Sequence, residues 1–439
     1  MSDVIPEGWS STIFGELTES IKSGLSRRIV NQDIGIPVLI SGNIQNNILD
    51  TKELKYWYVN DPQGADTTRY LLNDGDILLC FINSIAQIGK VCVYKDIGRP
   101  AIYTTNLFRI VANASCSPSF VYQLMTHQTF REEIQLITKP AVNQASFTKG
   151  DLEEIPVNLP PLPEQQKITA ILSSVDEVIE KTQAQINKLK DLKTGMMQEL
   201  LSPREGQAAN INNPQGESKN GLHHTEFKDS PLGRIPVGWE VKHLEQLVNP
   251  DKNITYGIVQ AGPHCDDGVP YIRVTDMSSR HLSRNEMLLT SQAIAEKYKR
   301  SAVSTGDIVY ALRGLIGHVL PVPSELHNAN LTQGTARISP NEDINSDYLL
   351  WALRSSYVAY QNDMEAKGST FREVTLASLR KIQICTPPKM EQEKLSCVLN
   401  GIESKTFIIE DRLIQLKSLK KALMQDLLTG KVRVQVDAS

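Results

Sequence analysis

The side chains that could break bonds are scattered along this chain of 439 residues. Pro250-Asp251 and the triplet Glu365-Ala366-Lys367 have the residue types of a metal-dependent nuclease, but more than a hundred residues separate them, and such triplets are frequent in long chains. His264-Cys265-Asp266 contains possible metal ligands, yet no second ligand pair stands at a metal-binding spacing. A turn is the better interpretation of that triplet. The residue types therefore predict no catalytic or metal site.

Motifs that transfer methyl groups or bind nucleotides are absent from the sequence. Adenine methylation uses an Asn/Asp-Pro-Pro-aromatic motif, whereas the Pro-Pro pairs at 160–161 and 387–388 come directly before expected helices. Gly89-Lys90 and Gly430-Lys431 lack the upstream glycine of a phosphate-binding loop. The sequence thus predicts no cofactor in this chain.

Charge and composition restrict the class of protein. The chain has 46 Lys and Arg against 50 Asp and Glu, a net charge of -4, so any contact with nucleic acid must be local. The longest apolar run, Ile77 to Ile82, is far below the roughly 18 residues of a membrane helix. The first residues resemble no secretion signal, and none of the six cysteines forms a Cys-x-x-Cys motif. We expect a cytoplasmic protein with reduced, buried thiols.

The chain contains an internal repeat. Ile5-Pro6-Glu7-Gly8-Trp9 recurs as Ile235-Pro236-Val237-Gly238-Trp239, and Gly75-Asp76-Ile77 recurs as Gly306-Asp307-Ile308. The offset between the copies drifts along these regions, which indicates two similar bodies with different loops. Trp9 and Trp239 hold matching positions and are expected to be core anchors.

Each body is followed by a segment in which the two copies match without gaps at an offset of 227. Pro160 to Lys167 matches Pro387 to Lys394, and Leu189 to Lys193 matches Leu416 to Lys420. An ungapped match of this length indicates a helix, because one inserted residue would rotate every later side chain by about 100°. Apolar residues in both segments alternate in steps of three and four, which predicts a coiled-coil seam; two core helices of a bundle are the alternative.

We expect an α+β fold, with two similar globular domains at opposite ends of two long helices that form an antiparallel coiled coil with a pseudo-twofold axis. Short strands are predicted at Ile36 to Ile40, Ile77 to Ile82, Pro270 to Val274 and Gly306 to Leu312, and a helix at Ser119 to Gln135. The predicted order is domain 1 at 1–160, the first spacer helix at 161–201, a polar linker at 202–226, domain 2 at 227–388, the second spacer helix at 389–430 and a tail at 431–439.

These features together resemble the specificity subunit of Type I restriction-modification enzymes. The resemblance covers nearly the whole chain and depends on motifs that occur in order and twice. They are Ile5 to Trp9, Pro160 to Gln165, Phe227 to Trp239, Pro387 to Gln392 and Leu427 to Val434.

The resemblance implies a non-catalytic subunit that binds double-stranded DNA. Each body would be a target recognition domain for one half of an asymmetric bipartite target, and the coiled coil would set the unread spacer between the halves. Two methylation subunits would dock for N6-adenine methylation, and restriction subunits would join for cleavage. S-adenosylmethionine, ATP and Mg would then be bound by those partners. Two other interpretations of the sequence stay open: a nuclease or methyltransferase that acts alone, and a coiled-coil scaffold unrelated to DNA.

Contacts to DNA are expected in the loops that differ between the copies, from basic residues for phosphates and from basic or amide residues for base edges. A solvated surface explains any one of them equally well, but neighbouring Gly and Asn residues favour close approach to phosphate. In the first body the candidates are Lys22, Arg27, Arg28, Asn43, Gln45, Asn83, Gln87, Lys90, Asn143, Gln144 and Lys149. In the second they are Arg273, Lys297, Lys299, Arg300, Arg313, His318, Lys367, Ser369, Thr370 and Arg372.

Apolar residues outside the seam of the helices are expected to dock the methylation subunits, unless they only widen the stripe that faces the core. These candidates are Ile171, Val178, Met197, Leu201, Val398, Leu419, Met424 and Leu428.

Overall fold

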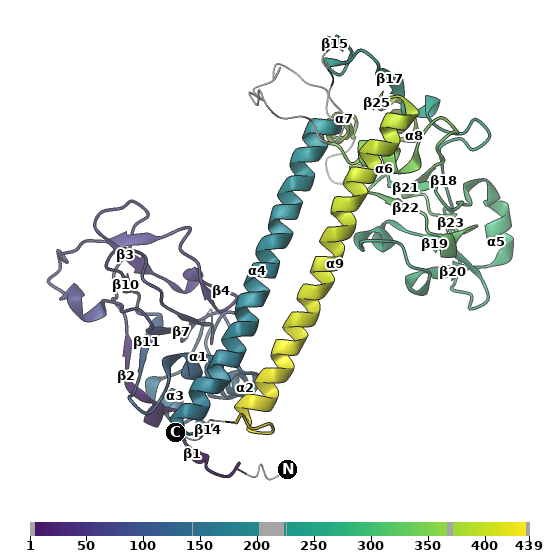
Figure 1. Cartoon of the computed structure of the whole chain (residues 1–439). Helices are drawn as coiled ribbons and strands as arrows, with labels where there is room; N and C mark the ends of the chain where they lie inside the picture. Colours follow the sequence, from purple (N-terminus) through teal and green to yellow (C-terminus); the bar gives the residue numbers. More distant parts are fainter. Residues whose placement is uncertain (1–4, 143, 202–223, 225, 367–371, 436–439) are drawn as a thin grey trace. The chain divides into compact units, whose positions relative to one another are not determined.

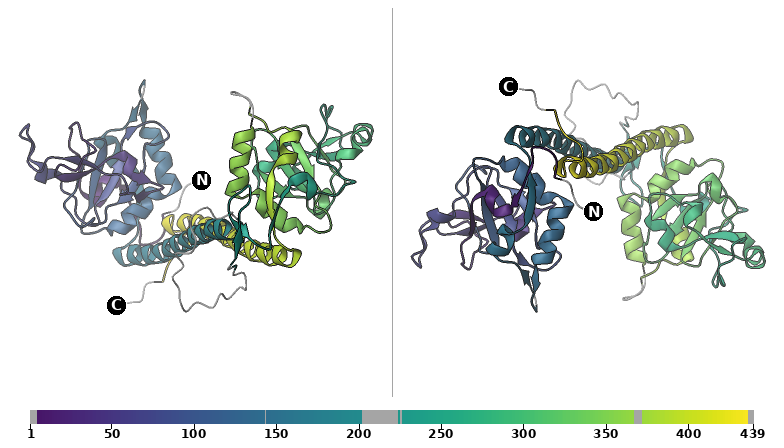
Figure 2. Two further views of the ribbon diagram at one scale, coloured as in Figure 1. Left: turned by 90° about the horizontal axis from the view of Figure 1, so that it is seen from above. Right: turned by 90° about the horizontal axis from the view of Figure 1, so that it is seen from below.

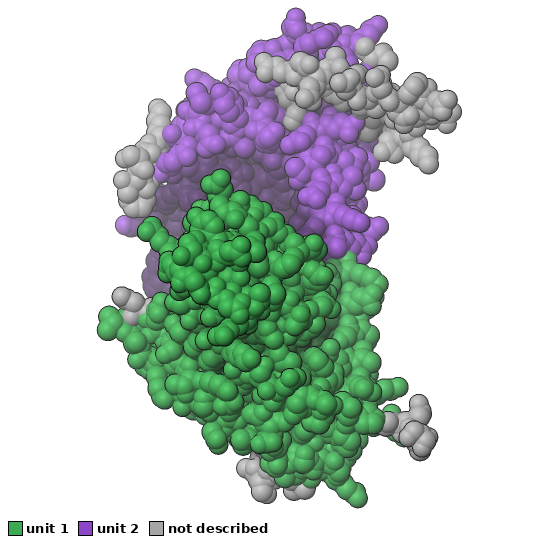
Figure 3. All heavy atoms as spheres, turned by 90° about the vertical axis from the view of Figure 1, so that its left-hand side faces the viewer, with its two compact units in different colours: residues 1–183, 411–439 green, residues 184–410 purple. Residues whose placement is uncertain are grey.

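The computed structural model describes residues 5–142, 144–201, 224, 226–366 and 372–435. The chain divides into two compact units, which Figure 3 shows in different colours. Unit 1 comprises Met1–Gln183 and Asp411–Ser439, and unit 2 comprises Ala184–Glu410. Each unit therefore contains one globular body together with part of both long helices. The predicted linker 202–226 lies outside the described residues except for His224 and Glu226.

Two helices of 40 residues, α4 (Leu162–Leu201) and α9 (Lys389–Leu428), confirm the predicted long helices (Figures 1 and 2). Their pairing within each unit is antiparallel. In unit 1, Lys420 Nζ of α9 lies 2.6 Å from Asp176 Oδ1 in the first half of α4. In unit 2, Lys190 Nζ near the end of α4 lies 2.7 Å from Glu410 Oε1. Seam positions that are buried include Ile168, Leu172, Ile186, Leu395, Leu399, Ile409 and Leu413.

In its described residues, the body of unit 1 has small sheets and three short α-helices. A four-stranded antiparallel sheet has the order β2 (Thr18–Ser23), β11 (Leu107–Ala112), β7 (Ile77–Cys80), β9 (Val91–Val93). A second sheet has the order β10 (Ile102–Tyr103), β3 (Ile36–Leu39), β6 (Lys55–Trp57), with β10 parallel to β3. The other pairings are β1 (Ser10–Ile13) with β14 (Pro156–Leu159), β4 (Ile44–Gln45) with β5 (Ile48–Leu49), and β12 (Lys139–Pro140) with β13 (Ala145–Ser146) and β8 (Ile82–Asn83). The helices are α1 (Pro118–Thr126), α2 (Gln128–Ile137) and α3 (Lys149–Glu153).

The body of unit 2 repeats this architecture. Its four-stranded sheet has the order β18 (Thr255–Tyr256), β24 (Thr335–Ile338), β21 (Ile308–Ala311), β22 (Val319–Pro321). Its three-stranded sheet has the order β20 (Leu288–Thr290), β19 (Val269–Ile272), β23 (Asn330–Leu331), with β19 and β23 parallel. Two further strand pairs are β17 (Glu240–His243) with β25 (Gln383–Thr386) and β15 (Phe227–Lys228) with β16 (Ile235–Pro236). The helices are α5 (Gln292–Lys297), α6 (Ser346–Leu353), α7 (Ser356–Glu365) and α8 (Leu376–Lys381). The prediction of two similar α+β bodies is confirmed.

The repeated Gly-Asp dipeptide forms the turn before the central strand of each body. Gly75 and Gly306 have φ values of 89° and 87°, a left-handed conformation that favours glycine. The next residue closes the turn, because Asp76 accepts a hydrogen bond from the backbone N–H of Asn73 and Asp307 accepts one from Ser304. The Asp76 carboxylate also pairs with Arg109 at 3.2 Å, although burial raises the pKa of Asp76.

The prediction of one continuous helix in the first body is wrong. The segment Ser119 to Gln135 is not a single helix, because it is divided into α1 and α2 at His127, whose φ and ψ of -66° and 147° are extended. Apolar residues continue on both sides of the break, so their periodicity does not reveal it. His127, at the break, is buried.

The repeated tryptophans attach each body to a long helix. Trp9 and Trp239 are buried, as expected, and their indole N–H groups donate to Glu164 at 3.0 Å and Glu391 at 3.1 Å. The glutamine that follows each glutamate binds the body as well. Gln165 accepts from the backbone N–H of Ser117 at 3.0 Å, and Gln392 accepts from that of Asn345 at 2.9 Å. The repeated Pro-Pro-x-x-Glu-Gln motif is therefore a junction between body and helix.

Candidate nucleic-acid interface

The loops after β2 and β7 leave the same edge of the four-stranded sheet in unit 1. Both strands are antiparallel to β11, and Phe108 of β11 lies opposite Ser23 on one side and Leu79 on the other. The backbone at Gly24 packs so closely that a Cβ there would lie 2.1 Å from the carbonyl oxygen of Tyr103. This close packing fixes the start of the loop that carries Arg27 and Arg28.

A second set of predicted loops meets at the same edge. Strand β8, which contains Asn83, pairs with β13, and β13 pairs with β12. The Asn83 side chain donates to the Ser41 hydroxyl at 3.1 Å, so it also ties in the turn that contains Asn43 and Gln45. Three loops that are far apart in the sequence, around residues 41–45, 82–90 and 139–146, are thereby brought together.

The candidate residues of unit 1 differ in how freely they are presented. Lys22, Arg28, Gln45, Gln144 and Lys149 are exposed, and Arg27, Asn83, Gln87 and Lys90 are half-buried. Two of the cations are already paired, because Arg27 binds Asp61 at 2.8 Å and Lys149 binds Glu153 at 3.3 Å. Asn143 lies outside the described residues.

Asn43 is placed differently from the expectation of a base-reading side chain. It is buried, and its amide accepts from the backbone N–H of Ile40 and donates to the carbonyls of Asp50 and Glu53. Its hydrogen-bonding groups are thus occupied within its own turn. In this structure Asn43 shapes the loop that presents Gln45.

Unit 2 repeats the same edge with different side chains. Tyr256 of β18 and Tyr310 of β21 both lie opposite Ala336 of β24, so the loops after these strands leave together. A Cβ at Gly257 would lie 1.9 Å from the carbonyl oxygen of Leu331, which is the counterpart of the Gly24 contact.

Beside this edge, unit 2 has a hollow of about 890 Å³. Its lining includes Arg313, Arg354 and Arg372, with the carboxylates of Asp363 and Glu373. Gly314 and Gly317 form part of the wall, and a Cβ at Gly317 would lie 2.8 Å from the Asn362 amide nitrogen. The hollow therefore combines several guanidinium groups with space against a glycine-rich backbone, an arrangement suited to phosphates or base edges.

The remaining candidate residues of unit 2 also differ in their exposure and in their ion pairs. Lys297, Lys299, Arg300, Arg313, His318 and Arg372 are exposed. Arg273 is half-buried, and its Nε lies 3.0 Å from Asp276 Oδ2 in a pair that closes a turn. Lys299 pairs with Glu296 at 2.6 Å and Arg372 with Asp363 at 3.2 Å. Lys367, Ser369 and Thr370 lie outside the described residues.

His318 is neutral at neutral pH in this setting. Although much of the His318 side chain is exposed, loss of solvent around the imidazole ring lowers its pKa, and the positive charge of Arg354 lowers it further. A neutral imidazole offers hydrogen bonds without a charge, so His318 suits a base edge better than a phosphate. Arg354 itself was missed by sequence reasoning, because no repeated motif marks the end of α6; only its position in the hollow reveals it.

The expected partner-docking residues fall into three groups. Val178 and Leu419 are exposed, with 39% and 50% of their surface accessible. Ile171, Met197 and Val398 are half-buried. Leu201, Met424 and Leu428 are buried in the cores of their own units, so these three cannot form a docking surface in this structure. Docking through the other five stays a prediction.

Other chemistry that the sequence raised has a simple structural setting. His264 Nδ1 accepts from the backbone N–H of Leu289, and the carbonyl of Cys265 accepts from Gly268, so this triplet lies in a turn. In the described ranges, no group of three metal-ligating side chains comes together, and no helix is long and apolar enough to cross a membrane. Cys397 is exposed and Cys265 is half-buried, so the expectation of buried thiols is correct for the other four cysteines only.

Comparison with known proteins agrees with this architecture. The sequence-family model of the Type I restriction modification DNA specificity domain matches this chain twice, at residues 6–191 and 236–418. The MjaX specificity subunit of a type I restriction enzyme from Methanocaldococcus jannaschii is 29% identical over 98% of this chain and 95% of its own length. The MjaVIII specificity subunit from the same organism is 25% identical over 98% of this chain and 94% of its own length.

Solved structures show the same fold. The S subunit of a Type I restriction-modification system from M. genitalium superimposes with a TM-score of 0.58 at 14% identity, covering 98% of this chain and 97% of that one. A chain of a type I system solved in a study of its assembly gives a TM-score of 0.54 at 15% identity, covering 98% of this chain and all of the other. Because the specificity-domain model matches most of the chain in two copies, the chain belongs to the Type I restriction modification DNA specificity family.

Proposed function

We propose that this chain is the non-catalytic specificity subunit that directs a Type I system to an asymmetric bipartite DNA target. The observation that carries the proposal is that one structural feature occurs twice. It is the edge of the four-stranded sheet from which the loops after β2 and β7 leave in unit 1, and the loops after β18 and β21 in unit 2; we call it the reading edge. Both units project loops from the same edge of equivalent sheets, but the side chains on those loops differ. Two similar scaffolds with different loops suit two different half-sites.

The spacing of the half-sites would be set by the long helices. A helix of 40 residues is about 60 Å long at 1.5 Å per residue, and each end of α4 and α9 is joined to a body by a glutamate or by core packing. The bases between the half-sites would not be read.

Catalysis would belong to partner subunits in the cytoplasm. Two methylation subunits, with S-adenosylmethionine, would methylate adenine at N6, and restriction subunits, with ATP and Mg, would cleave. The net charge of -4 supports this division of labour, because an acidic chain cannot supply many phosphate contacts and tight binding would require partners that close around the duplex.

The test is co-expression with methylation subunits, followed by mapping of N6-methyladenine in cells with and without the chain. We expect a bipartite methylated motif that disappears on deletion and changes in one half only when residues 1–160 are exchanged for those of another member of the family. Methylation or cleavage by the purified chain alone would favour an independent enzyme. An assembled, active complex whose methylation does not depend on the chain would favour a scaffold unrelated to DNA.

A further inference from the structure

Unit 1 contains a second hollow, of about 860 Å³, away from the predicted reading residues. It lies where the junction of α1 and α2 faces the last turns of α9, and we call it the basic groove. Four basic side chains line it: Arg131 of α2 and Lys417, Lys420 and Lys421 of α9. The acidic lining residue is Glu132, which accepts a hydrogen bond from Gln128 at 2.8 Å.

Most of this positive charge is not neutralised within the part of the chain that the structure describes. Lys420 pairs with Asp176 at 2.6 Å. Arg131, Lys417 and Lys421 are exposed, and no described carboxylate lies within ion-pair distance of them. His127 in the wall does not add charge at neutral pH, because burial lowers its pKa. Three cations without an ion pair therefore line one hollow.

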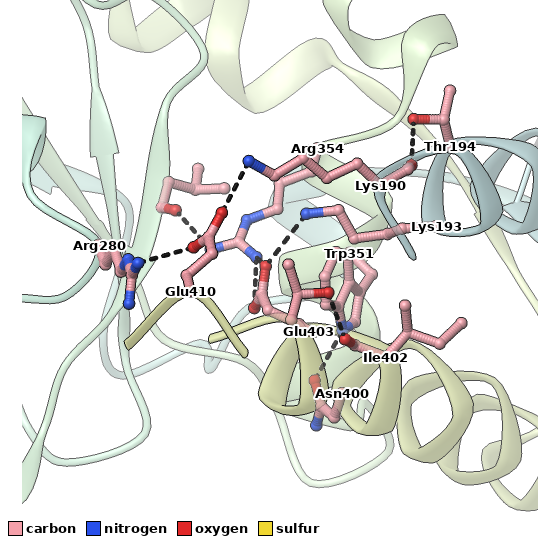
Figure 4. A network of polar contacts seen from close by, with 12 residues as sticks. Lys190, Lys193, Thr194, Arg280, Trp351, Arg354, Asn400, Ile402, Glu403 and Glu410 are labelled. Atoms are coloured by element: carbon pink, nitrogen blue, oxygen red, sulfur yellow. Dashed lines mark hydrogen bonds and ion pairs between the residues drawn. The ribbon is translucent and has the colours of Figure 1, made fainter. Parts of the chain in front are cut away.

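The equivalent place in unit 2 is neutralised. The offset of 227 puts Lys190, Lys193 and Thr194 at the positions of Lys417, Lys420 and Lys421. As Figure 4 shows, Lys190 pairs with Glu410 at 2.7 Å and Lys193 with Glu403 at 3.5 Å.

Glu403 also pairs with Arg354 at 3.2 Å, and Glu410 with Arg280 at 2.7 Å. The same offset places Gln183 of unit 1 where unit 2 has Glu410, so Lys417 lacks the acidic partner of its counterpart. The basic groove is thus a feature of unit 1 and not a property of the repeated scaffold.

Helix α2 connects the basic groove to the reading edge. Arg131 lines the groove near the start of α2, and α2 ends at Ile137, just before β12 with its exposed Lys139, which pairs with Asp151 at 3.1 Å. Ile134 of the same helix packs under the loop of predicted contacts, because a Cβ at Gly89 would lie 2.9 Å from its side chain. The eight steps from Arg131 to Lys139 cover at least roughly 12 Å at helical rise, a length over which one DNA strand presents about three or four phosphates.

We propose that the basic groove binds the sugar-phosphate backbone of duplex DNA next to the half-site read by unit 1. This inference rests on the proposed function and adds a contact that is independent of base sequence. An acidic protein segment is a weaker fit, because protein docking depends on buried apolar and aromatic anchors and the groove offers only Met424 and Ala422 among polar side chains. Contacts to phosphate would fix the register of the duplex without contributing to sequence discrimination.

The experiment compares two triple variants in the assembled complex with methylation subunits. Arg131→Gln, Lys417→Gln and Lys421→Gln remove the unpaired charges of the groove. Lys167→Gln, Lys188→Gln and Lys405→Gln are the matched control, because these exposed lysines lie on α4 and α9 outside the groove and the structure gives them no ion pair. Binding of a duplex that carries the methylated motif is measured as a function of salt concentration.

We expect the groove variant to reduce the slope of log affinity against log salt by about 2 to 3, close to 0.9 for each lost phosphate contact, while the control keeps the wild-type slope. Its affinity should fall at least roughly tenfold near physiological salt, on target and non-target duplexes alike. Methylphosphonate linkages beside the unit 1 half-site should weaken wild-type binding and leave the groove variant unaffected.

A groove variant with the wild-type slope and affinity overturns the proposal. So does a variant that assembles poorly with the methylation subunits but keeps its salt slope, since that result assigns the groove to an acidic protein partner. If the wild-type complex shows no preference for any duplex, the proposed function fails first, and the groove proposal fails with it. Thermal unfolding of the variants verifies that each retains its fold.

Discussion

The indole nitrogen of Trp9 donates a 3.0 Å hydrogen bond to the Glu164 carboxylate, 155 positions later in the chain. Both residues are buried, and Arg433 binds the same carboxylate at 2.8 and 2.9 Å. This arrangement joins the beginning of the body, the beginning of α4 and the segment after α9 within unit 1. Unit 2 repeats the first contact between Trp239 and Glu391, where His224 supplies the other partner at 2.7 Å.

Replacement of Trp9 by phenylalanine should destabilise the protein. The substitution keeps most of the apolar volume but leaves the buried Glu164 carboxylate short of one donor, at a cost of about 1–3 kcal/mol. The free energy of unfolding, measured by urea denaturation, checks this expectation.

Trp57→Phe is the matched control for Trp9→Phe. Trp57 is equally buried, but its indole nitrogen has no hydrogen-bond partner in the described structure. Equal destabilisation by the two substitutions would contradict a role of the Trp9 hydrogen bond.

Acidification should destabilise the protein through His127. Burial lowers the pKa of this residue below its usual value near 6.5, although a hydrogen bond with Gln425 and the charge of Glu132 act in the opposite direction. The unfolded chain therefore binds the proton more readily than the folded one, and stability is lost as the pH falls from about 7 through the folded-state pKa.

His127→Gln should flatten that dependence. The variant keeps a polar side chain of similar reach and removes the titrating group. Unfolding free energies between pH 5 and pH 8 measure the effect, and His318→Gln is a useful comparison because burial and Arg354 also lower the pKa of His318. A variant whose stability falls as steeply as that of the wild type would show that other groups carry the dependence.

The long-range plan of the fold could be predicted because its signals are local and duplicated. The heptad steps and the ungapped offset of 227 define α4 and α9, and the repeated Trp and Pro-Pro-x-x-Glu-Gln motifs mark their junctions with the bodies. The break at His127 could not be predicted, because apolar residues continue through it.

The individual site residues were less predictable. Residue type identified Asn43 as a candidate, but whether an amide faces its own turn or the solvent depends on tertiary contacts. The basic groove was missed for a similar reason, since Lys417 and Lys190 look alike in the sequence and differ only in their acidic neighbours.

Arg313 and Arg273 should respond differently to replacement by alanine. Arg313 is exposed in the hollow of unit 2, so its loss should cost about 1–3 kcal/mol of binding discrimination at one position of the target half-site. Arg273 pairs with Asp276 in a turn, so its loss should instead lower stability.

The two effects are separated by measuring binding to duplexes with single base changes and thermal unfolding of the same variants. If Arg273→Ala relaxed specificity with unchanged stability, the assignment of Arg273 to the scaffold would be wrong. If Arg313→Ala bound all duplexes like the wild type, Arg313 would be a solvated surface residue.

Gly24→Ala should disturb the reading edge of unit 1 through its backbone. The added Cβ would lie 2.1 Å from the Tyr103 carbonyl oxygen and 2.5 Å from that of Thr104, and neither backbone group can move without shifting its neighbours in the fold. We expect destabilisation of about 1–3 kcal/mol, typical of overpacking, together with weaker binding of the half-site that unit 1 reads.

Gly195→Ala is the control, with an expected change in stability of the opposite sign. Gly195 lies within α4 with nothing within 4 Å of the added Cβ, so alanine there should stabilise the helix by about 0.5–1 kcal/mol. Denaturant unfolding should show lower stability for Gly24→Ala and higher stability for Gly195→Ala. Binding of the half-site should weaken for Gly24→Ala only. A Gly24→Ala variant as stable as the wild type would contradict the close packing of this loop.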